Sequence, residues 1–146
     1  RRCIELATEA RAQGNAPFGS LLVSRDGEVI AERRNEVNTT GDQTAHPELP
    51  LASWASRNLE PAERTSATMY TSGEHCTMCA AGHVWAGIGR LVFAFSSEMI
   101  REHADPGRTR VAISAREVIE RSNVKIRVDG PCLELAGKLP ALFQRP

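Results

Sequence analysis

The sequence predicts an α/β fold in which helices cover both faces of a mostly parallel sheet. A hairpin signal comes first, and strand and helix patterns then alternate along the chain. Such alternation requires crossover connections, which place helices on the faces of a sheet. The 146 residues are 41% hydrophobic and 25% charged, as is typical of one compact domain, and no repeat or linker divides them. We therefore expect residues 1–146 to form a single domain.

A helix and a hairpin are predicted at the start of the chain. Apolar residues recur with helical spacing over 3–12, and Gly14 follows as a stop signal. The short runs 20–24 and 29–32 flank Asp26–Gly27. An Asp-Gly pair is typical of a tight turn between two antiparallel strands, so these runs predict a β-hairpin.

The middle of the chain is predicted to continue with a loop over 38–42 and a helix over about 46–58. Pro47 and Pro50 are compatible with that helix only in its first turn, because proline lacks the backbone N–H that later turns require. Residues 68–72 are then expected to form a strand.

The second half is predicted to hold a helix over 76–87 and a fully buried strand over 90–95. Residues 101–110 are polar and are expected to form a loop. A weaker strand is predicted near 124–128, and a final helix near 132–143. The predicted order after the hairpin is therefore helix, strand, helix, strand, followed by one more strand and helix.

The charge balance and the apolar runs exclude several classes of protein. Lys plus Arg and Asp plus Glu both number 18, so the net charge is zero, which argues against a dedicated nucleic-acid binder. The longest apolar run, Leu91–Phe95, is far shorter than the roughly 20 residues of a membrane span. The chain starts without a secretory signal, and its four cysteines are expected to be thiols, so we expect a cytoplasmic protein with no membrane partner.

Three side chains from two segments are candidate metal ligands. Cys76 and Cys79 lie at the predicted start of a helix after a strand, and their i, i+3 spacing points both sulfurs to one side. The helix N-terminus favours the thiolate form that binds metals. His46, at the start of the other predicted helix, completes a set of three. Three protein ligands and one open position are typical of catalytic zinc, so Zn²⁺ is the expected cofactor.

Glu48 is the candidate catalytic residue. It follows His46 by two positions, which on a regular helix points it about 200° away from the imidazole, so it is poorly placed to bind the same metal. A carboxylate beside the metal can instead act as a general base, because zinc lowers the pKa of a bound water to about 7.

The motifs resemble those of a known family. An H-x-E motif followed by P-C-x-x-C is the signature of zinc deaminases, and here His75 stands in place of the proline. With Ala16–Val23, Asp42–Glu48, Cys76–Ala80 and Ile88–Phe93, the chain resembles the cytidine deaminase superfamily, in particular the bacterial branch of guanine deaminases and tRNA adenosine deaminases. The resemblance implies a three-layer α/β/α sandwich around a five-stranded mixed sheet, a zinc ion and a homodimer.

The resemblance also suggests substrate contacts. Asn35 matches the family asparagine that hydrogen-bonds the substrate base, and the backbone of Ala45 is expected to face the same base. Phe18 and Trp85 are candidates to pack against the ring, with core packing as their alternative. Glu74 either holds the pocket backbone or faces solvent.

The sequence therefore predicts a zinc-dependent hydrolytic deaminase that releases ammonia from a guanine-, cytosine- or triazine-like base or nucleoside. The substrate is expected to be a small molecule, with no nucleic acid bound. Alternatives remain: a tRNA adenosine deaminase, a dithiol redox protein, a non-catalytic zinc-binding partner subunit, or a structural zinc site. The last of these needs a fourth ligand such as His75, His83 or Cys132. Glu48 argues against a non-catalytic subunit, which needs no acid/base residue.

Overall fold

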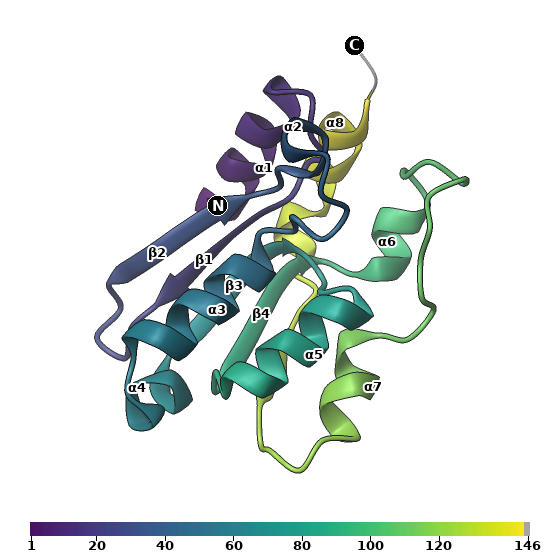
Figure 1. Cartoon of the computed structure of the whole chain (residues 1–146). Coiled ribbons are helices and arrows are strands. Elements are labelled where there is room, and N and C mark those ends of the chain that lie inside the picture. The colour runs from purple at the N-terminus through teal and green to yellow at the C-terminus, as the bar shows by residue number, and fades with distance from the viewer. Residues whose placement is uncertain (145–146) are drawn as a thin grey trace.

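The computed structural model describes residues 1–144 and contains a five-stranded sheet with the strand order β2-β1-β3-β4-β5 (Figure 1). The strands are β1 (Gly19–Val23), β2 (Val29–Arg34), β3 (Thr68–Gly73), β4 (Arg90–Phe95) and β5 (Arg127–Asp129). β1 pairs antiparallel with β2 and with β3, while β3 with β4 and β4 with β5 pair parallel. The predicted five-stranded mixed sheet is confirmed.

The expectation of a mostly parallel sheet holds for strand direction, because β2, β3, β4 and β5 run the same way, but two of the four strand pairings are antiparallel. The physical reason lies in the hairpin. β2 and β3 run in the same direction and are joined by a crossover, as the helix between them predicts, but the hairpin partner β1 lies between them in the sheet. One inserted strand therefore creates two antiparallel pairings.

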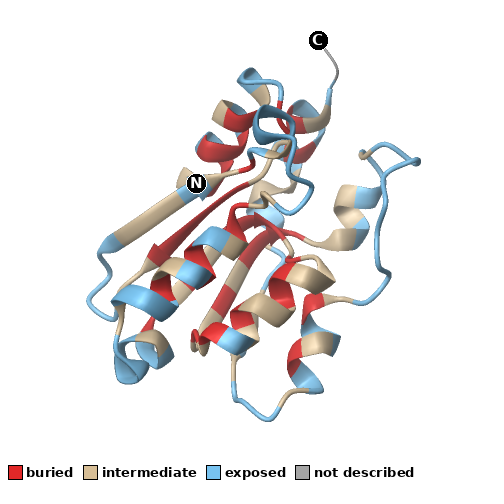
Figure 2. Cartoon of the chain, in the orientation of Figure 1, coloured by how far each residue is buried: buried red, intermediate tan, exposed pale blue. Residues whose placement is uncertain are grey.

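Helices cover both faces of the sheet, which confirms the three-layer arrangement (Figure 1). One layer contains α3 (Glu48–Asn58), α5 (Thr77–Ala86) and α7 (Ala115–Glu120), and the other contains α1 (Arg2–Ala12), the 3-10 helix η1 (Leu133–Lys138) and α8 (Leu139–Phe143). Buried apolar clusters fill the space on each side of the sheet, as the burial map shows (Figure 2). Apolar side chains of the strands are therefore buried on both faces of the sheet.

The remaining short helices were not expected. They are α2 (Val37–Thr40), α4 (Pro61–Ser66) and α6 (Ser97–Arg101). α7 was also missed, β5 begins three residues later than the expected 124, and the expected final helix divides into η1 and α8. These helices have four to six residues, too short for a periodic apolar pattern to be recognised.

Two glycines allow close contact between layers. A Cβ on Gly19 would come within 2.3 Å of the Leu6 Cβ, so α1 packs directly on β1 only because this residue is glycine. A Cβ on Gly89 would come within 1.8 Å of the Thr65 carbonyl oxygen, which fixes the start of β4 beside the end of α4.

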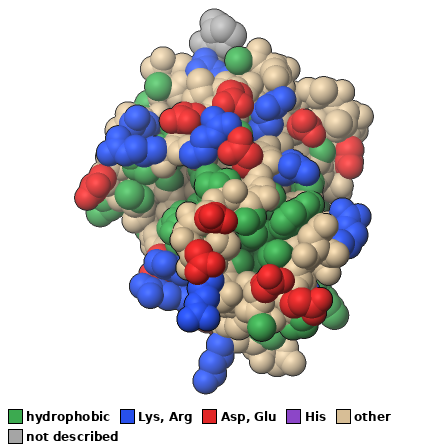
Figure 3. Space-filling model, turned by 90° about the vertical axis from the view of Figure 1, so that its left-hand side faces the viewer, with side chains coloured by type: hydrophobic (Ala, Val, Ile, Leu, Met, Phe, Trp, Pro, Cys, Tyr) green, Lys and Arg blue, Asp and Glu red, His purple; other side chains and the backbone are tan. Residues whose placement is uncertain are grey.

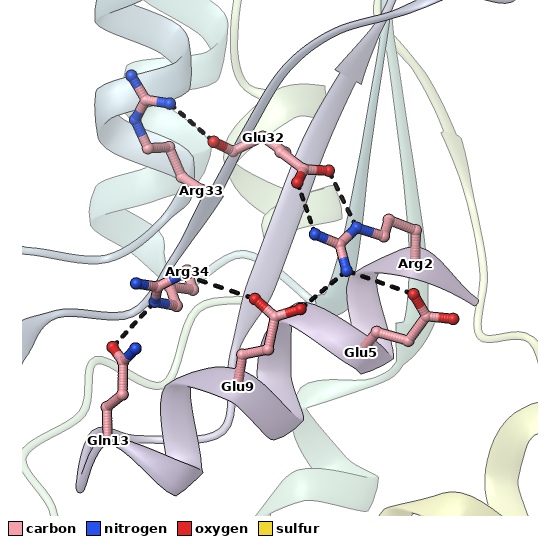
Figure 4. A network of polar contacts seen from close by, with 7 residues as sticks. All are labelled: Arg2, Glu5, Glu9, Gln13, Glu32, Arg33 and Arg34. Atoms are coloured by element: carbon pink, nitrogen blue, oxygen red, sulfur yellow. Dashed lines mark hydrogen bonds and ion pairs between the residues drawn. The ribbon is translucent and has the colours of Figure 1, made fainter.

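Charged side chains join α1 to the edge strand β2 (Figure 4). Arg2 donates to the Glu32 carboxylate at 2.6 and 3.1 Å and to Glu9 at 2.8 Å, and Arg34 donates to Gln13 at 3.0 Å. Figure 3 shows basic and acidic side chains intermixed on this side of the molecule. Charges along an edge strand disfavour pairing with the strand of another chain.

Candidate metal centre

The candidate ligands come together where two helices of the same layer begin. α5 starts directly after the β3 segment, with Cys76 as its N-cap residue and Cys79 in its first turn. His46 lies just before α3, whose N-cap is Pro47. The helix that was expected from about residue 46 therefore starts two residues later, at Glu48. Pro50 falls in the first turn of α3, where its missing N–H leaves no hydrogen bond unmade.

The distances between the three side chains fit a tetrahedral zinc ion. The Nδ1 atom of His46 is 3.6 Å from Sγ of Cys76 and 3.6 Å from Sγ of Cys79. With Zn–S and Zn–N bonds of about 2.3 and 2.0 Å, tetrahedral geometry separates ligand atoms by about 3.5–3.8 Å. Within the described residues, these three form the one group of His, Cys, Asp and Glu that is arranged to bind a metal.

The two cysteines differ in protonation, with Cys76 as the thiolate and Cys79 as the thiol. Hydrogen bonds from Cys79 and His46 lower the pKa of Cys76 to about 4, with burial opposing them. The pKa of Cys79 is raised, because its proton is shared with Cys76 and because the thiol is buried. The pKa of His46 is raised mainly by its hydrogen bond to Cys76. Such a set exchanges its protons for a metal ion when the metal binds.

Glu48 lies beside these ligands at the start of α3 and is 5% exposed. Its Oε1 atom accepts hydrogen bonds from the hydroxyls of Ser20 at 3.1 Å and Thr71 at 3.0 Å. Burial raises the pKa of the Glu48 carboxyl, and its interaction with His46 opposes that shift. A buried carboxyl with a raised pKa, next to a metal centre, is suited to accept and return a proton.

Asn35 has an unpaired buried amide donor, and the next residue, Glu36, is hydrogen-bonded to Ala45, which precedes His46. Asn35 follows β2 and is fully buried. Its Oδ1 accepts the N–H of Val37 at 3.2 Å, whereas its Nδ2 has no hydrogen-bond partner among the described residues. An unpaired buried amide donor is costly in a folded protein unless a ligand satisfies it.

The backbone of Ala45 is already engaged within the same loop. Its N–H donates to the carbonyl of Asp42 at 3.1 Å, and its carbonyl accepts the N–H of Glu36 at 3.1 Å. The Ala45 N–H is thus not available to a substrate in this structure. Its carbonyl oxygen keeps a second lone pair.

Phe18 lies at the start of β1, next to Asn35, whose N–H donates to the Phe18 carbonyl at 2.9 Å. The Phe18 ring makes an edge contact with Phe143, with centroids 5.9 Å apart. The Arg108 guanidinium lies 5.2 Å from the same ring centroid. Arg108 belongs to the loop expected over 101–110, so that loop reaches the site. No sequence signal distinguishes Arg108 from Arg101 and Arg110.

The structure places Trp85 at the surface and Glu74 in contact with backbone. Trp85 is 89% exposed and lies nine residues beyond Cys76, about 13 Å along α5, so its contact with a substrate ring stays a prediction. Glu74 accepts the N–H of Ser97 at 2.8 Å and of Ala115 at 3.0 Å. Its carboxylate therefore joins the starts of α6 and α7 and holds backbone, which is one of its two expected roles.

His75, which replaces the signature proline, is turned into the core. Its Nε2 is 3.2 Å from Nδ1 of His83, and Nε2 of His83 is 3.0 Å from the Ile88 carbonyl oxygen. Burial lowers the pKa of both imidazoles, to about 4 for His83. Both rings are thus neutral and join the segment before α5, through the last turns of that helix, to the loop after it. Neither belongs to the metal-binding group, so neither provides the fourth ligand of a structural zinc site.

Residues 1–95 match the family model of the cytidine and deoxycytidylate deaminase zinc-binding region. The chain belongs to this deaminase family. Its members are zinc-dependent hydrolases of carbon–nitrogen bonds, and His46, Cys76 and Cys79 form a set that fits their metal. The predicted family, enzyme class and zinc cofactor are confirmed.

The chain is similar to deaminases with different substrates. It is 31% identical to a probable cytosine deaminase of Schizosaccharomyces pombe over 96% of this chain and 86% of that protein. It is 38% identical to a guanine deaminase of Bacillus subtilis over 72% of this chain and 64% of that protein. It is 35% identical to a tRNA-specific adenosine deaminase of Haemophilus influenzae over 66% of this chain and 56% of that protein.

The fold of this chain is also found in solved structures. A guanine deaminase from Nitrosomonas europaea superimposes with a TM-score of 0.73 over 97% of this chain and 80% of that chain, at 20% sequence identity. This likeness concerns the fold. Among the described residues of this deaminase, no helix combines the length and apolar character of a membrane span.

Proposed function

We propose that this family member hydrolyses an amino-substituted nucleobase, nucleoside or related heterocycle and releases the exocyclic amine as ammonia. The observation that carries the proposal is the buried Glu48 carboxyl beside three ligand atoms spaced for tetrahedral zinc. The relatives named for cytosine and guanine deamination support a free base of the cytosine or guanine type, and a nucleoside or a triazine presents the same amine to the site in this proposal. In this proposal residues 1–146 act as one deaminase domain.

When bound, zinc supplies the polarisation that makes water a nucleophile at neutral pH. The remaining proton chemistry falls to Glu48. It takes a proton from the attacking water and delivers it to the ring nitrogen, while oxygen bonds to the carbon that bears the amine. The carbon–nitrogen bond then breaks, and Glu48 returns the water's second proton to the departing amine. Water and the amine are thereby converted into an oxo-heterocycle and ammonia.

Asn35 and Phe18 orient the heterocycle in this proposal. The unpaired Nδ2 of Asn35 is a donor that suits a ring nitrogen or carbonyl oxygen of the base. The Phe18 ring, which contacts the Arg108 guanidinium, offers a surface for stacking. Asn35→Ala is expected to raise KM at least about tenfold, because one hydrogen bond to a buried polar group is lost.

The decisive experiment measures ammonia release by the zinc-loaded protein. Free bases, nucleosides and amino-triazines are the substrates, and Glu48→Ala is the blank. One activity well above the blank defines the reaction and its substrate class. No release from any compound, with one zinc ion bound per chain, contradicts the proposal and favours a tRNA substrate or a non-catalytic partner subunit.

A tRNA adenosine deaminase is the second candidate, because relatives with that activity match this chain. It requires a positive surface around the site, whereas Lys plus Arg and Asp plus Glu are equal at 18 each. Inosine formation in a tRNA anticodon loop, with an affinity that falls steeply with salt, is the result that supports it over the small-molecule substrate.

We further propose a homodimer located in the cytoplasm. Trp85 is 89% exposed and lies on α5, the helix that carries the two cysteines, and tryptophan is enriched at protein–protein interfaces. Light scattering is expected to give twice the chain mass, and Trp85→Glu to give the monomer mass. An unchanged dimer in this variant removes Trp85 from the interface. Reduced cysteine ligands favour the cytoplasm.

A further inference from the structure

Two hydroxyls occupy core positions of the sheet beneath Glu48. Ser20 on β1 and Thr71 on β3 are cross-strand partners, and so are Leu22 and Met69, two residues further along on the same face. Leu22 and Met69 belong to the apolar core under α3 and α5. Strand alternation therefore predicts a second apolar pair at the position of Ser20 and Thr71, and the sequence instead places two buried hydroxyls there.

These hydroxyls form a closed group with one carboxylate oxygen. Ser20 Oγ lies 2.9 Å from Thr71 Oγ1, and both lie within 3.1 Å of Oε1 of Glu48. All three side chains are buried, with exposed fractions of 0%, 2% and 5%. Each hydroxyl has one proton to donate, so the two can satisfy Oε1 together. The carboxylate is thus held from below by the sheet at one of its two oxygens.

We propose that Ser20 and Thr71 are positioning residues that fix the Glu48 carboxylate, so that Oε2 alone carries the transferred proton. The inference rests on the proposed deaminase function. Both oxygens of an unrestrained carboxylate are equivalent, and rotation about its terminal bond exchanges them. Two hydroxyl donors on Oε1 block that exchange, because rotation leaves buried donors without an acceptor. Proton transfer then starts from one geometry, and such preorganisation speeds the chemical step rather than substrate binding.

Ser20 and Thr71 lie at rigid positions of the fold, whereas Glu48 does not. Ser20 and Thr71 belong to adjacent central strands, whose backbones are paired on both sides by neighbouring strands. Glu48 belongs to the first turn of a helix that begins after a loop. The two hydroxyls therefore hold the Glu48 carboxylate against the rigid sheet, although the backbone of Glu48 itself is less constrained.

The test compares three variants of the zinc-loaded protein. The double variant Ser20→Ala/Thr71→Val removes both hydroxyls with little change of shape. Thr71→Ser keeps a hydroxyl at its position. Thr68→Val is the matched control, because Thr68 lies on the same strand but faces the opposite side. For each variant we would measure kcat, KM and zinc content, and determine the crystal structure around Glu48.

The double variant is expected to lose about 10- to 100-fold in kcat with KM within about twofold of the parent. It should retain one zinc ion per chain, and its Glu48 carboxylate should turn away from the wild-type position. Thr71→Ser, which keeps both hydroxyls, should retain most of the parent's kcat, and the kcat of Thr68→Val should equal that of the parent. Turnover within twofold of the parent, loss of zinc, or an unmoved carboxylate in the double variant overturns the inference. If the parent itself releases no ammonia, the proposed function fails and the proton-transfer role with it, and the carboxylate position then tests only whether the two hydroxyls fix the Glu48 side chain.

Discussion

Replacing Glu48 by Gln removes a proton carrier from the metal centre and keeps its shape. The glutamine carbonyl oxygen can still accept the hydroxyl hydrogen bonds of Ser20 and Thr71, so the support from the sheet remains. The three candidate ligands are unchanged, so the variant should bind one zinc ion per chain. The amide cannot accept a proton from water at neutral pH, and this is the single property that the substitution removes.

The expected loss of activity follows from that property. General acid–base catalysis contributes about 10²- to 10⁴-fold, which corresponds to about 3–5 kcal/mol of transition-state stabilisation. Because Glu48 transfers protons at more than one step of the proposed reaction, we expect the upper part of this range in kcat. KM should change little, since the carboxyl is not assigned to substrate binding.

The same variant has a second, independent readout in the metal-free protein. Burial raises the pKa of the Glu48 carboxyl above its ordinary value of 4.5. The folded state then binds more protons than the unfolded state, so stability is lost as the pH rises from 4.5 towards the folded-state pKa. Glutamine does not ionise, and metal-free Glu48→Gln should therefore melt at a higher temperature than the parent at pH 7, with the difference vanishing near pH 4.

The assays are ammonia release, zinc content and thermal unfolding by circular dichroism. Glu36→Gln is the matched control, because Glu36 is an exposed carboxylate close in sequence and should leave all three readouts unchanged. Near-normal turnover by zinc-loaded Glu48→Gln would refute its acid/base role. A lower melting temperature than the parent at pH 7 would refute the argument from burial.

Three further substitutions and one titration test the site and the packing. Because the pKa of Cys79 is raised, zinc binding should release its proton, so zinc affinity should fall about tenfold per unit of falling pH, and Cys79→Ser should abolish tight binding. Gly89→Ala places a Cβ 1.8 Å from the Thr65 carbonyl oxygen and should cost about 2–3 kcal/mol in urea unfolding. Leu51→Ala should cost about 2–5 kcal/mol, because Leu51 is fully buried in the core under α3.

Each of these predictions has a contradicting result, and the two stability predictions also have control variants. A pH-independent zinc affinity would contradict the protonated state of Cys79. For Gly89→Ala the control is Gly137→Ala, whose Cβ would meet nothing within 4 Å, and equal stability of the two variants would contradict the close contact. For Leu51→Ala the control is Leu133→Ala at a position that is 75% exposed, and a loss of equal size would show that burial does not set the cost.

Local patterns in the sequence were sufficient for most elements and for the candidate metal ligands. The hairpin around Asp26–Gly27, the helices at α1, α3 and α5 and the strands β3 and β4 all lie close to their expected positions. His46, Cys76 and Cys79 were found because ligand chemistry restricts both the residue types and their spacing. These features depend on residues near one another in the chain, so periodicity and motif carry the information.

The tertiary structure alone decided which distant segments meet. The sequence gives no reason for β1 to lie between β2 and β3, for Arg108 to contact Phe18, or for Trp85 to face solvent. The hydroxyls beneath Glu48 are recognisable only when the register of β1 against β3 is known. The Ser20–Thr71 and Phe18–Arg108 contacts join residues more than 50 positions apart, and they are selected by the packing of the whole sheet and its helices rather than by any local preference.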